Sequence, residues 1–271
     1  MFQPNRTVGK SEIDTLDLAQ RVAVEAQITD ARASALGVNG LIGINTDLAH
    51  YASRYAWRRH LFGFLGSVNG KVLLDIACGY SMTPVMFALA GATVHAIDVA
   101  PKTLALVEHV AACKGVAERI QIHVGPAEEL PFDDASFDLL YGGAALHHLQ
   151  LDRAGRELAR VLKPGGRGGF QDPLGHNLLL EFTRDYLSYR GKHPSKGTDR
   201  PLRMHEVQAF GRHFTTATYH GFELFSMVAK ALRLKRASRL RHKLEATDDA
   251  MLARVPLLQR YARFVVTCVT K

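Results

Sequence analysis

The chain has 271 residues, 47% of them hydrophobic, which is enough material for the core of one large α/β domain. It has no run of about eighteen apolar residues, so the sequence predicts no membrane span, and the polar start of the chain lacks the apolar stretch of a secretory signal. The three cysteines (Cys78, Cys113 and Cys268) are widely spaced and fit neither a disulfide framework nor a zinc cluster. These features predict a reduced, cytoplasmic protein without a metal site.

The net charge of +8 is distributed unevenly along the sequence. Residues 1–150 contain 11 basic and 15 acidic side chains, whereas residues 151–271 contain 23 basic and 11 acidic ones. Such a positive potential attracts anionic partners over long distances, but an ordinary solvated surface explains the pattern equally well. Charge alone leaves both interpretations open.

The amino-terminal part of the chain, residues 1–66, predicts two helices. Ser11 is a capping residue at the start of a helical stretch over residues 11–36, and a second helical stretch covers residues 48–65. Several aromatic side chains in the second stretch are expected either to pack in the core or to form a lid over a ligand. They are Tyr51, Tyr55 and Trp57.

Strand and helix patterns then alternate through residues 67–175. The expected strands are 72–76, 93–98, 120–124, 137–141 and 168–171, and the expected helices are near 84–90, 101–114 and 152–162. Alternation of this kind predicts βαβ units and a parallel sheet. For residues 176–271 we expect substrate-side helices and the final strands of the sheet. These include a basic amphipathic helix over residues 224–244 and a strand over residues 261–269.

The first strand leads into a turn of small residues. The sequence Leu-Asp-Ile-Ala-Cys-Gly-Tyr-Ser covers residues 74–81, and such a turn lets a nucleotide-like ligand approach the main chain at the carboxyl end of a parallel sheet. Asp98 follows at the end of the second strand, where a carboxylate can accept hydrogen bonds from both hydroxyls of a ribose. Together the two features predict a nucleoside-binding site.

Four blocks of the sequence resemble class I S-adenosylmethionine-dependent methyltransferases, and within them the ubiquinone- and menaquinone-biosynthesis type. The blocks are LDIACGYS at 74–81, VHAIDVAP at 94–101, AEELPFDDASFDLLYGGAALHHL at 127–149 and RELARVLKPGG at 156–166. The resemblance implies a doubly wound, mostly parallel seven-stranded sheet of the Rossmann-like methyltransferase fold. It also implies an amino-terminal helical lid, a carboxy-terminal helical insertion, S-adenosyl-L-methionine as cofactor and S-adenosyl-L-homocysteine as product.

By the same resemblance, particular residues are expected to bind the cofactor. Asp75 would lie near its ammonium group. Many relatives have an acidic residue where this chain has Pro126, so the adenine contact falls either to Glu128 or to the main chain of Ala127. The full expected set is Asp75, Ala77, Cys78, Gly79, Tyr80, Asp98, Val99, Ala127, Glu128 and Gly142.

Catalytic side chains are less well defined by the sequence. His147 and His148 are candidates for a general base, with a scaffold role as the alternative, and Asp172 and His176 follow the fifth strand at the ligand-binding edge. Because the leaving group of a sulfonium is neutral, methyl transfer depends mainly on in-line placement and desolvation of the acceptor.

The leading hypothesis is therefore transfer of a methyl group to a small, partly apolar metabolite. The Asp/Asn-Pro-Pro-aromatic motif of amino-group methylation in nucleic acids is absent after the fourth strand, where the chain has Tyr141-Gly142-Gly143-Ala144. An RNA methyltransferase stays an alternative because of the basic second half. A non-catalytic cofactor-binding scaffold is the other, because Ala77, Ser81 and Pro126 depart from the family pattern. Residues 230–243 are a candidate for weak contact with an anionic surface.

Overall fold

The computed structural model describes residues 17–36, 41, 43–177, 200–226 and 239–271. A single sheet of seven strands forms its centre, in the order β3-β2-β1-β4-β5-β7-β6. The strands are β1 (Val72–Ile76), β2 (Thr93–Asp98), β3 (Ile120–Val124), β4 (Phe137–Gly143), β5 (Leu162–Pro173), β6 (Thr216–Phe222) and β7 (Phe264–Thr270). β1 to β5 are parallel and β7 is antiparallel to both of its neighbours. The doubly wound, mostly parallel sheet expected from the sequence is confirmed.

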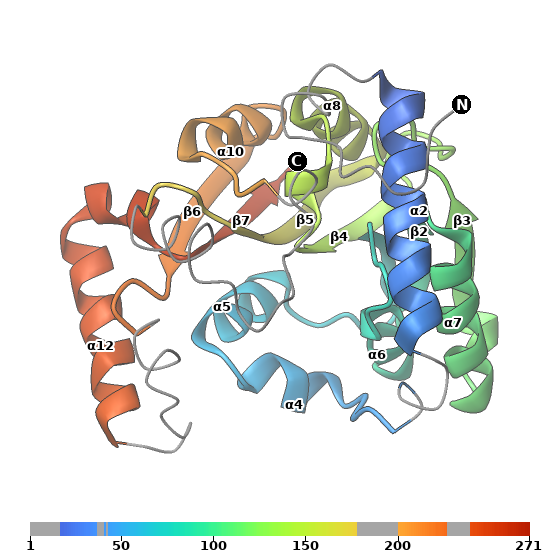
Figure 1. The fold of residues 1–271 in the computed structure, drawn as a ribbon, viewed down its shortest axis with the longest axis horizontal. Coiled ribbons are helices and arrows are strands. Elements are labelled where there is room, and N and C mark those ends of the chain that lie inside the picture. Colours follow the sequence, from blue (N-terminus) through green and yellow to red (C-terminus); the bar gives the residue numbers. More distant parts are fainter. Residues whose placement is uncertain (1–16, 37–40, 42, 178–199, 227–238) are drawn as a thin grey trace.

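Helices cover both faces of this sheet (Figure 1). They are α2 (Leu18–Leu36), α4 (Leu48–Ser53), α5 (Ala56–Leu65), α6 (Thr83–Leu89), α7 (Pro101–Cys113), α8 (Leu151–Val161), α10 (Met204–Gly211) and α12 (Arg239–Arg254). Short 3-10 helices cover 117–119, 146–148 and 256–261. Figure 1 shows α8 and α10 on one side of the sheet and α5 and α6 on the other, with α2 beside α7. Within the described ranges, no helix is both long enough and apolar enough to cross a bilayer.

Two apolar layers result from the alternation of side chains along each strand. On one face Leu73, Leu139 and Tyr141 pack against α5 and α6. On the other face Leu74, Leu140 and Phe170 pack toward α8 and α10. The same alternation decides on which face each polar side chain at the strand ends lies.

The expected helix over residues 48–65 is divided into α4 and α5. The Asp47 carboxylate caps α4 by accepting the N–H groups of Ala49 and His50, at 2.8 and 3.1 Å. Tyr55 then takes an extended conformation before α5 begins. The division turns the aromatic side chains of the two short helices toward one another.

The expected helix over residues 224–244 lies partly outside the described residues. Residues 224–226 form a turn instead of a helix, residues 227–238 are not described, and the remaining part belongs to α12. The contact predicted for the basic stretch 230–243 therefore falls mostly outside the described residues. α10 and β6 were not among the expected elements.

Two histidine pairs lie between elements that pack on each other. His95 on β2 and His123 on β3 have Nδ1 and Nε2 3.1 Å apart, and the ring centroids of His60 on α5 and His220 on β6 are 4.1 Å apart. Burial lowers the pKa of all four imidazoles, and repulsion from the partner lowers the pKa of His60 and His95 further. Each pair therefore stays neutral to a lower pH than exposed imidazoles do.

We expect the free energy of unfolding to fall as the pH drops below about 6.5, the ordinary pKa of histidine in the unfolded chain. Below that pH the unfolded chain binds more protons than the folded one. Above it both states are neutral, so this contribution is constant. Urea unfolding at pH 7.5 and pH 5.5 measures the change, and His123→Gln with His220→Gln should reduce it. If the double variant lost as much unfolding free energy between pH 7.5 and pH 5.5 as the wild-type protein does, these histidines would not be the source of the pH dependence.

Candidate active site

The turn after β1 leaves main chain exposed at the carboxyl edge of the sheet. Ala77 and Gly79 both have left-handed backbone conformations, with φ of 47° and 53°. Among the described residues, no neighbouring atom lies within 4 Å of the place where a Cβ on Gly79 would be, so these residues leave the space above this turn open. A ligand can therefore approach the main chain closely there.

Asp98, at the end of β2, holds this turn in place. Its Oδ2 accepts the N–H of Gly79 at 2.8 Å, and its Oδ1 accepts the N–H of Ala100 at 2.9 Å. Burial raises the pKa of the carboxyl, while the same N–H groups act in the opposite direction. Each oxygen keeps a second lone pair, so the carboxylate can still accept hydroxyl groups of a ligand.

Replacing Ala77 by glycine is expected to stabilise the protein. A residue with a Cβ in the left-handed region costs about 1 kcal/mol, part of which is offset because glycine has more freedom in the unfolded chain. We expect the free energy of unfolding to rise by roughly 0.5 kcal/mol, measured by urea denaturation. Gly79→Ala is the matched control, and it should change stability in the opposite direction.

Asp75 is an almost fully buried acidic group of the site. Its side chain is 1% exposed; Oδ2 accepts the hydroxyl of Thr83 at 2.6 Å, and Oδ1 has no hydrogen-bond partner. Burial raises the pKa of this carboxyl to about 8, against the hydrogen bond from Thr83, and the neighbouring charge of Asp98 raises it further. An oxygen of this kind is suited to a cationic ligand group.

A hollow of about 220 Å³ lies over Asp75, between the strand ends and the helices α4 and α5. Of the aromatic lid candidates, Tyr51 and Trp57 line it, whereas Tyr55 stacks on Trp57 with 6.1 Å between the ring centroids. Several lining residues were not among the cofactor-binding, catalytic or lid residues expected from the sequence. They are Arg58, Thr83, Tyr141, Gly143, Ala144 and Gln171.

The two glycines at the end of β4 have different roles. A Cβ on Gly142 would lie 2.8 Å from Cδ1 of Phe170, so this expected cofactor residue packs against the core on the α8 side. Gly143, one residue later, lines the hollow. Alternation along the strand separates the two.

Of the four catalytic candidates, His147 and Asp172 lie together. His147 Nδ1 is 2.8 Å from Asp172 Oδ1, which also accepts the main-chain N–H of His147 at 3.2 Å. Asp172 follows Phe170 on the α8 face, whereas Gln171 faces the hollow. Neither His147 nor Asp172 lines the hollow.

The other two candidates contact other parts of the fold. His148 Nδ1 lies 3.4 Å from Glu25 Oε1 of α2, and Arg21 of the same helix donates to the His148 carbonyl at 2.9 Å. His176 Nε2 accepts the N–H of Met204 at the start of α10. All four candidates follow β4 or lie near the end of β5, but their side chains do not form one common site.

The remaining expected cofactor residues surround the same edge. Glu128 accepts the N–H of Gln150 at 2.8 Å, and burial raises the pKa of its carboxyl. Buried Ala127 and Cys78 are part of the wall, and Cys78 lines the hollow. The side chain of Tyr80 is exposed and Val99 is half-buried. Among the described residues, no three metal-binding side chains gather in a way that could hold an ion.

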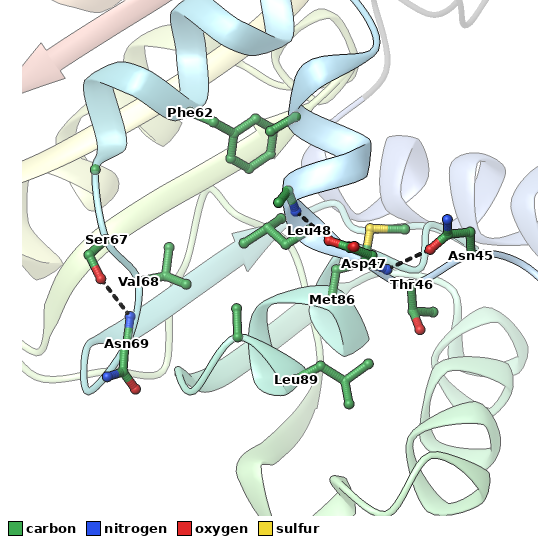
Figure 2. A pocket seen from close by; sticks show the side chains of 14 residues that line it. Asn45, Thr46, Asp47, Leu48, Phe62, Ser67, Val68, Asn69, Met86 and Leu89 are labelled. Atoms are coloured by element: carbon green, nitrogen blue, oxygen red, sulfur yellow. Dashed lines mark hydrogen bonds between the residues drawn. The ribbon is translucent and has the colours of Figure 1, made fainter.

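A second hollow, of about 780 Å³, lies near the amino-terminal ends of β1 and β2. Figure 2 shows the apolar side chains of Leu48, Phe62 and Met86 around it. Its polar groups bond to nearby main chain: Asn45 Oδ1 accepts the N–H of Asp47 at 2.9 Å. Ligands of open parallel sheets bind at the other edge, so this hollow does not belong to the candidate active site.

Known proteins resemble the central part of the chain. A family model described as a methyltransferase domain matches residues 74–169. A demethylmenaquinone methyltransferase of Corynebacterium efficiens is 36% identical over 124 residues, which are 45% of this chain and 50% of that protein. A 27-O-demethylrifamycin SV methyltransferase of Amycolatopsis mediterranei is 37% identical over 110 residues, 40% of each chain. The chain thus spans half or less of the length of these relatives.

A solved structure agrees in fold. The cyclase SpnF superimposes with a TM-score of 0.52 at 19% identity, over 79% of this chain and 78% of that one. Residues 74–169 thus match a methyltransferase domain and lie in a Rossmann-like sheet, and the resemblance to the ubiquinone- and menaquinone-biosynthesis type is confirmed over this core.

Proposed function

We propose that the protein is an S-adenosyl-L-methionine-dependent methyltransferase that acts on a small, partly apolar metabolite. The observation that carries the proposal is the turn after β1, where open main chain at Gly79 lies beside the carboxylate of Asp98. The match of residues 74–169 to a methyltransferase domain supports it. The two relatives named above are methyltransferases of a quinone precursor and of a rifamycin, and both names describe small molecules.

The residues of the site fit this cofactor. Asp98 would accept the ribose hydroxyls, the turn at Gly79 would contact the cofactor through main chain, and the free oxygen of Asp75 would face its ammonium. When bound, S-adenosyl-L-methionine supplies an activated methyl group on a sulfonium. The protein then has to hold an acceptor in line with that group and exclude water.

We propose a positioning role for His147 and Asp172. The carboxylate binds both the imidazole and the main chain of His147, which fixes the segment that joins β4 to α8. Gly143 and Ala144 at the start of this segment line the hollow. A direct role as general base is less compatible with their place on the α8 face.

The helices α2 and α4–α5 are the proposed cover of the site. α2 is tied to the edge by Arg21 and Glu25, which contact His148. Tyr51 and Trp57 close the hollow from α4 and α5. This arrangement supports the lid expected in residues 1–66.

Calorimetric titration with S-adenosyl-L-methionine tests binding directly. Incubation with methyl-labelled cofactor and a fractionated metabolite extract, followed by mass identification of labelled products, tests transfer and identifies the acceptor. Absence of binding at millimolar cofactor would overturn the proposal.

Two alternatives have their own tests. An RNA methyltransferase, favoured by the basic second half of the chain, predicts RNA affinity that falls steeply with salt. A protein with this fold need not transfer methyl groups, since the superimposed SpnF is named as a cyclase. Cofactor binding without any labelled product would favour that second alternative.

A further inference from the structure

The hollow over Asp75 is lined by one acidic and one basic side chain. Asp75 comes from the end of β1, and Arg58 comes from α5. Arg58 makes no ion pair with a carboxylate of the described residues, and Asp75 makes none with a described cation. Asp75 is buried, and Arg58 is half-buried with its Nε atom buried. Ionisable groups removed from water are normally paired, so an acidic and a basic side chain that line one cavity without such a partner indicate a ligand with one group of each charge.

Arg58 is held by stacking. Its guanidinium carbon lies 3.5 Å from the ring centroid of Tyr51, 5.0 Å from that of Tyr55 and 4.9 Å from that of Trp57. The Nε atom is buried without a hydrogen-bond partner, and Nη1 makes one long bond, of 3.4 Å, to the Tyr51 carbonyl. A stacked guanidinium keeps the N–H groups in its plane available, in the geometry that a carboxylate accepts in pairs.

Asp75 provides the opposite charge. Its Oδ1 is buried and has no partner, while Thr83 satisfies Oδ2. The pKa of this carboxyl is raised to about 8, mainly because burial removes water. A bound ammonium would replace the lost solvation and restore the ionised form.

We propose that Arg58 binds the carboxylate of the amino-acid part of S-adenosyl-L-methionine, while Asp75 binds its ammonium. The inference rests on the proposed function and adds a residue from outside the matched domain. The aromatic side chains Tyr51, Tyr55 and Trp57 then serve to orient Arg58, and carboxylate binding ties α5 to the strand ends.

Three ligands that differ in these charged groups allow the contribution of each group to be measured. S-adenosyl-L-methionine carries both groups, its decarboxylated form lacks the carboxylate, and 5′-methylthioadenosine lacks both groups. The wild-type protein should prefer the complete cofactor over the decarboxylated form. In Arg58→Gln that preference should fall by about 10- to 100-fold, the range for a charged hydrogen-bonded pair, while the affinity for 5′-methylthioadenosine stays within about twofold.

Arg59→Gln is the matched control, because Arg59 is the exposed neighbour of Arg58 and binds the Ser53 carbonyl instead. It should leave the preference unchanged. Arg58→Lys keeps the charge without the planar fork, and an intermediate preference is expected. It also provides a second readout should the glutamine variant fold poorly.

The possible results are distinct. An unchanged preference in Arg58→Gln would overturn the inference while the proposed function stands. Equal weakening of all three ligands would also overturn it, since it would indicate displacement of the helix and not loss of carboxylate binding. Failure of the wild-type protein to bind any of them would reject the proposed function itself.

Discussion

Asp98→Ala is expected to weaken the binding of S-adenosyl-L-methionine by about 10- to 100-fold, or about 1–3 kcal/mol. The substitution removes the proposed acceptor of the ribose hydroxyls. It also leaves the N–H groups of Gly79 and Ala100 without their acceptor, so the turn loses its support. Calorimetric titration measures the affinity, and circular dichroism checks that the fold is retained.

Asp133→Ala is a charge-matched control for this experiment. Asp133 is an exposed carboxylate in the segment before β4, and its removal changes the net charge equally without touching the turn. Its affinity for the cofactor should equal that of the wild-type protein. If Asp98→Ala binds the cofactor as tightly as this control does, the ribose assignment is wrong.

Much of the sheet could be predicted from the sequence. The bounds of β1, β2 and β3 agree with the expected strands because each is a short run of apolar or β-favouring residues that ends in a turn. Asp75 and Asp98 were expected at the strand ends for the same reason. Parallel strands bring their carboxyl ends to one edge, so sequence order alone brought these two carboxylates together.

Other parts depended on tertiary contacts that no local pattern records. β6 is an edge strand whose side chains are mostly exposed or half-buried, so it has no apolar run to reveal it. Arg58 lies in a stretch that reads as one amphipathic helix, and its stacking on Tyr51 follows from the division between α4 and α5. Gln171 and Asp172 face opposite sides because side chains alternate along β5, which extends to Pro173, whereas the expected strand ended at residue 171.

The catalytic candidates illustrate the same limit. His147 and His148 are adjacent in sequence, yet one binds Asp172 and the other lies against Glu25 of α2. Their spacing in the sequence could not show whether they act as a general base or as part of the scaffold, because either role would place a histidine at this edge of the sheet. The contacts of Asp172 with the His147 main chain and ring favour the scaffold.

The second large effect concerns Asp248, a carboxylate of α12 that is 2% exposed. Its oxygens accept the main-chain N–H groups of Leu224, Phe225 and Ser226 at 2.9, 2.7 and 3.0 Å, and also the Ser226 hydroxyl at 2.6 Å. One carboxylate thus accepts the three main-chain N–H groups of the turn that follows β6. Asp248→Ala leaves these donors buried without an acceptor, and we expect the free energy of unfolding to fall by about 3 kcal/mol.

Urea denaturation measures this loss, with Asp249→Ala as the control on the neighbouring, exposed position. Partial burial, and then repulsion from Asp248, raise the pKa of Asp249, so removing that carboxyl should change stability by less than about 0.5 kcal/mol. Asp248→Asn should also lower the free energy of unfolding. Its amide nitrogen cannot accept a hydrogen bond, and it would face one of the N–H groups that the carboxylate accepts. Equal unfolding free energies for Asp248→Ala and Asp249→Ala would show that the turn after β6 does not depend on this carboxylate.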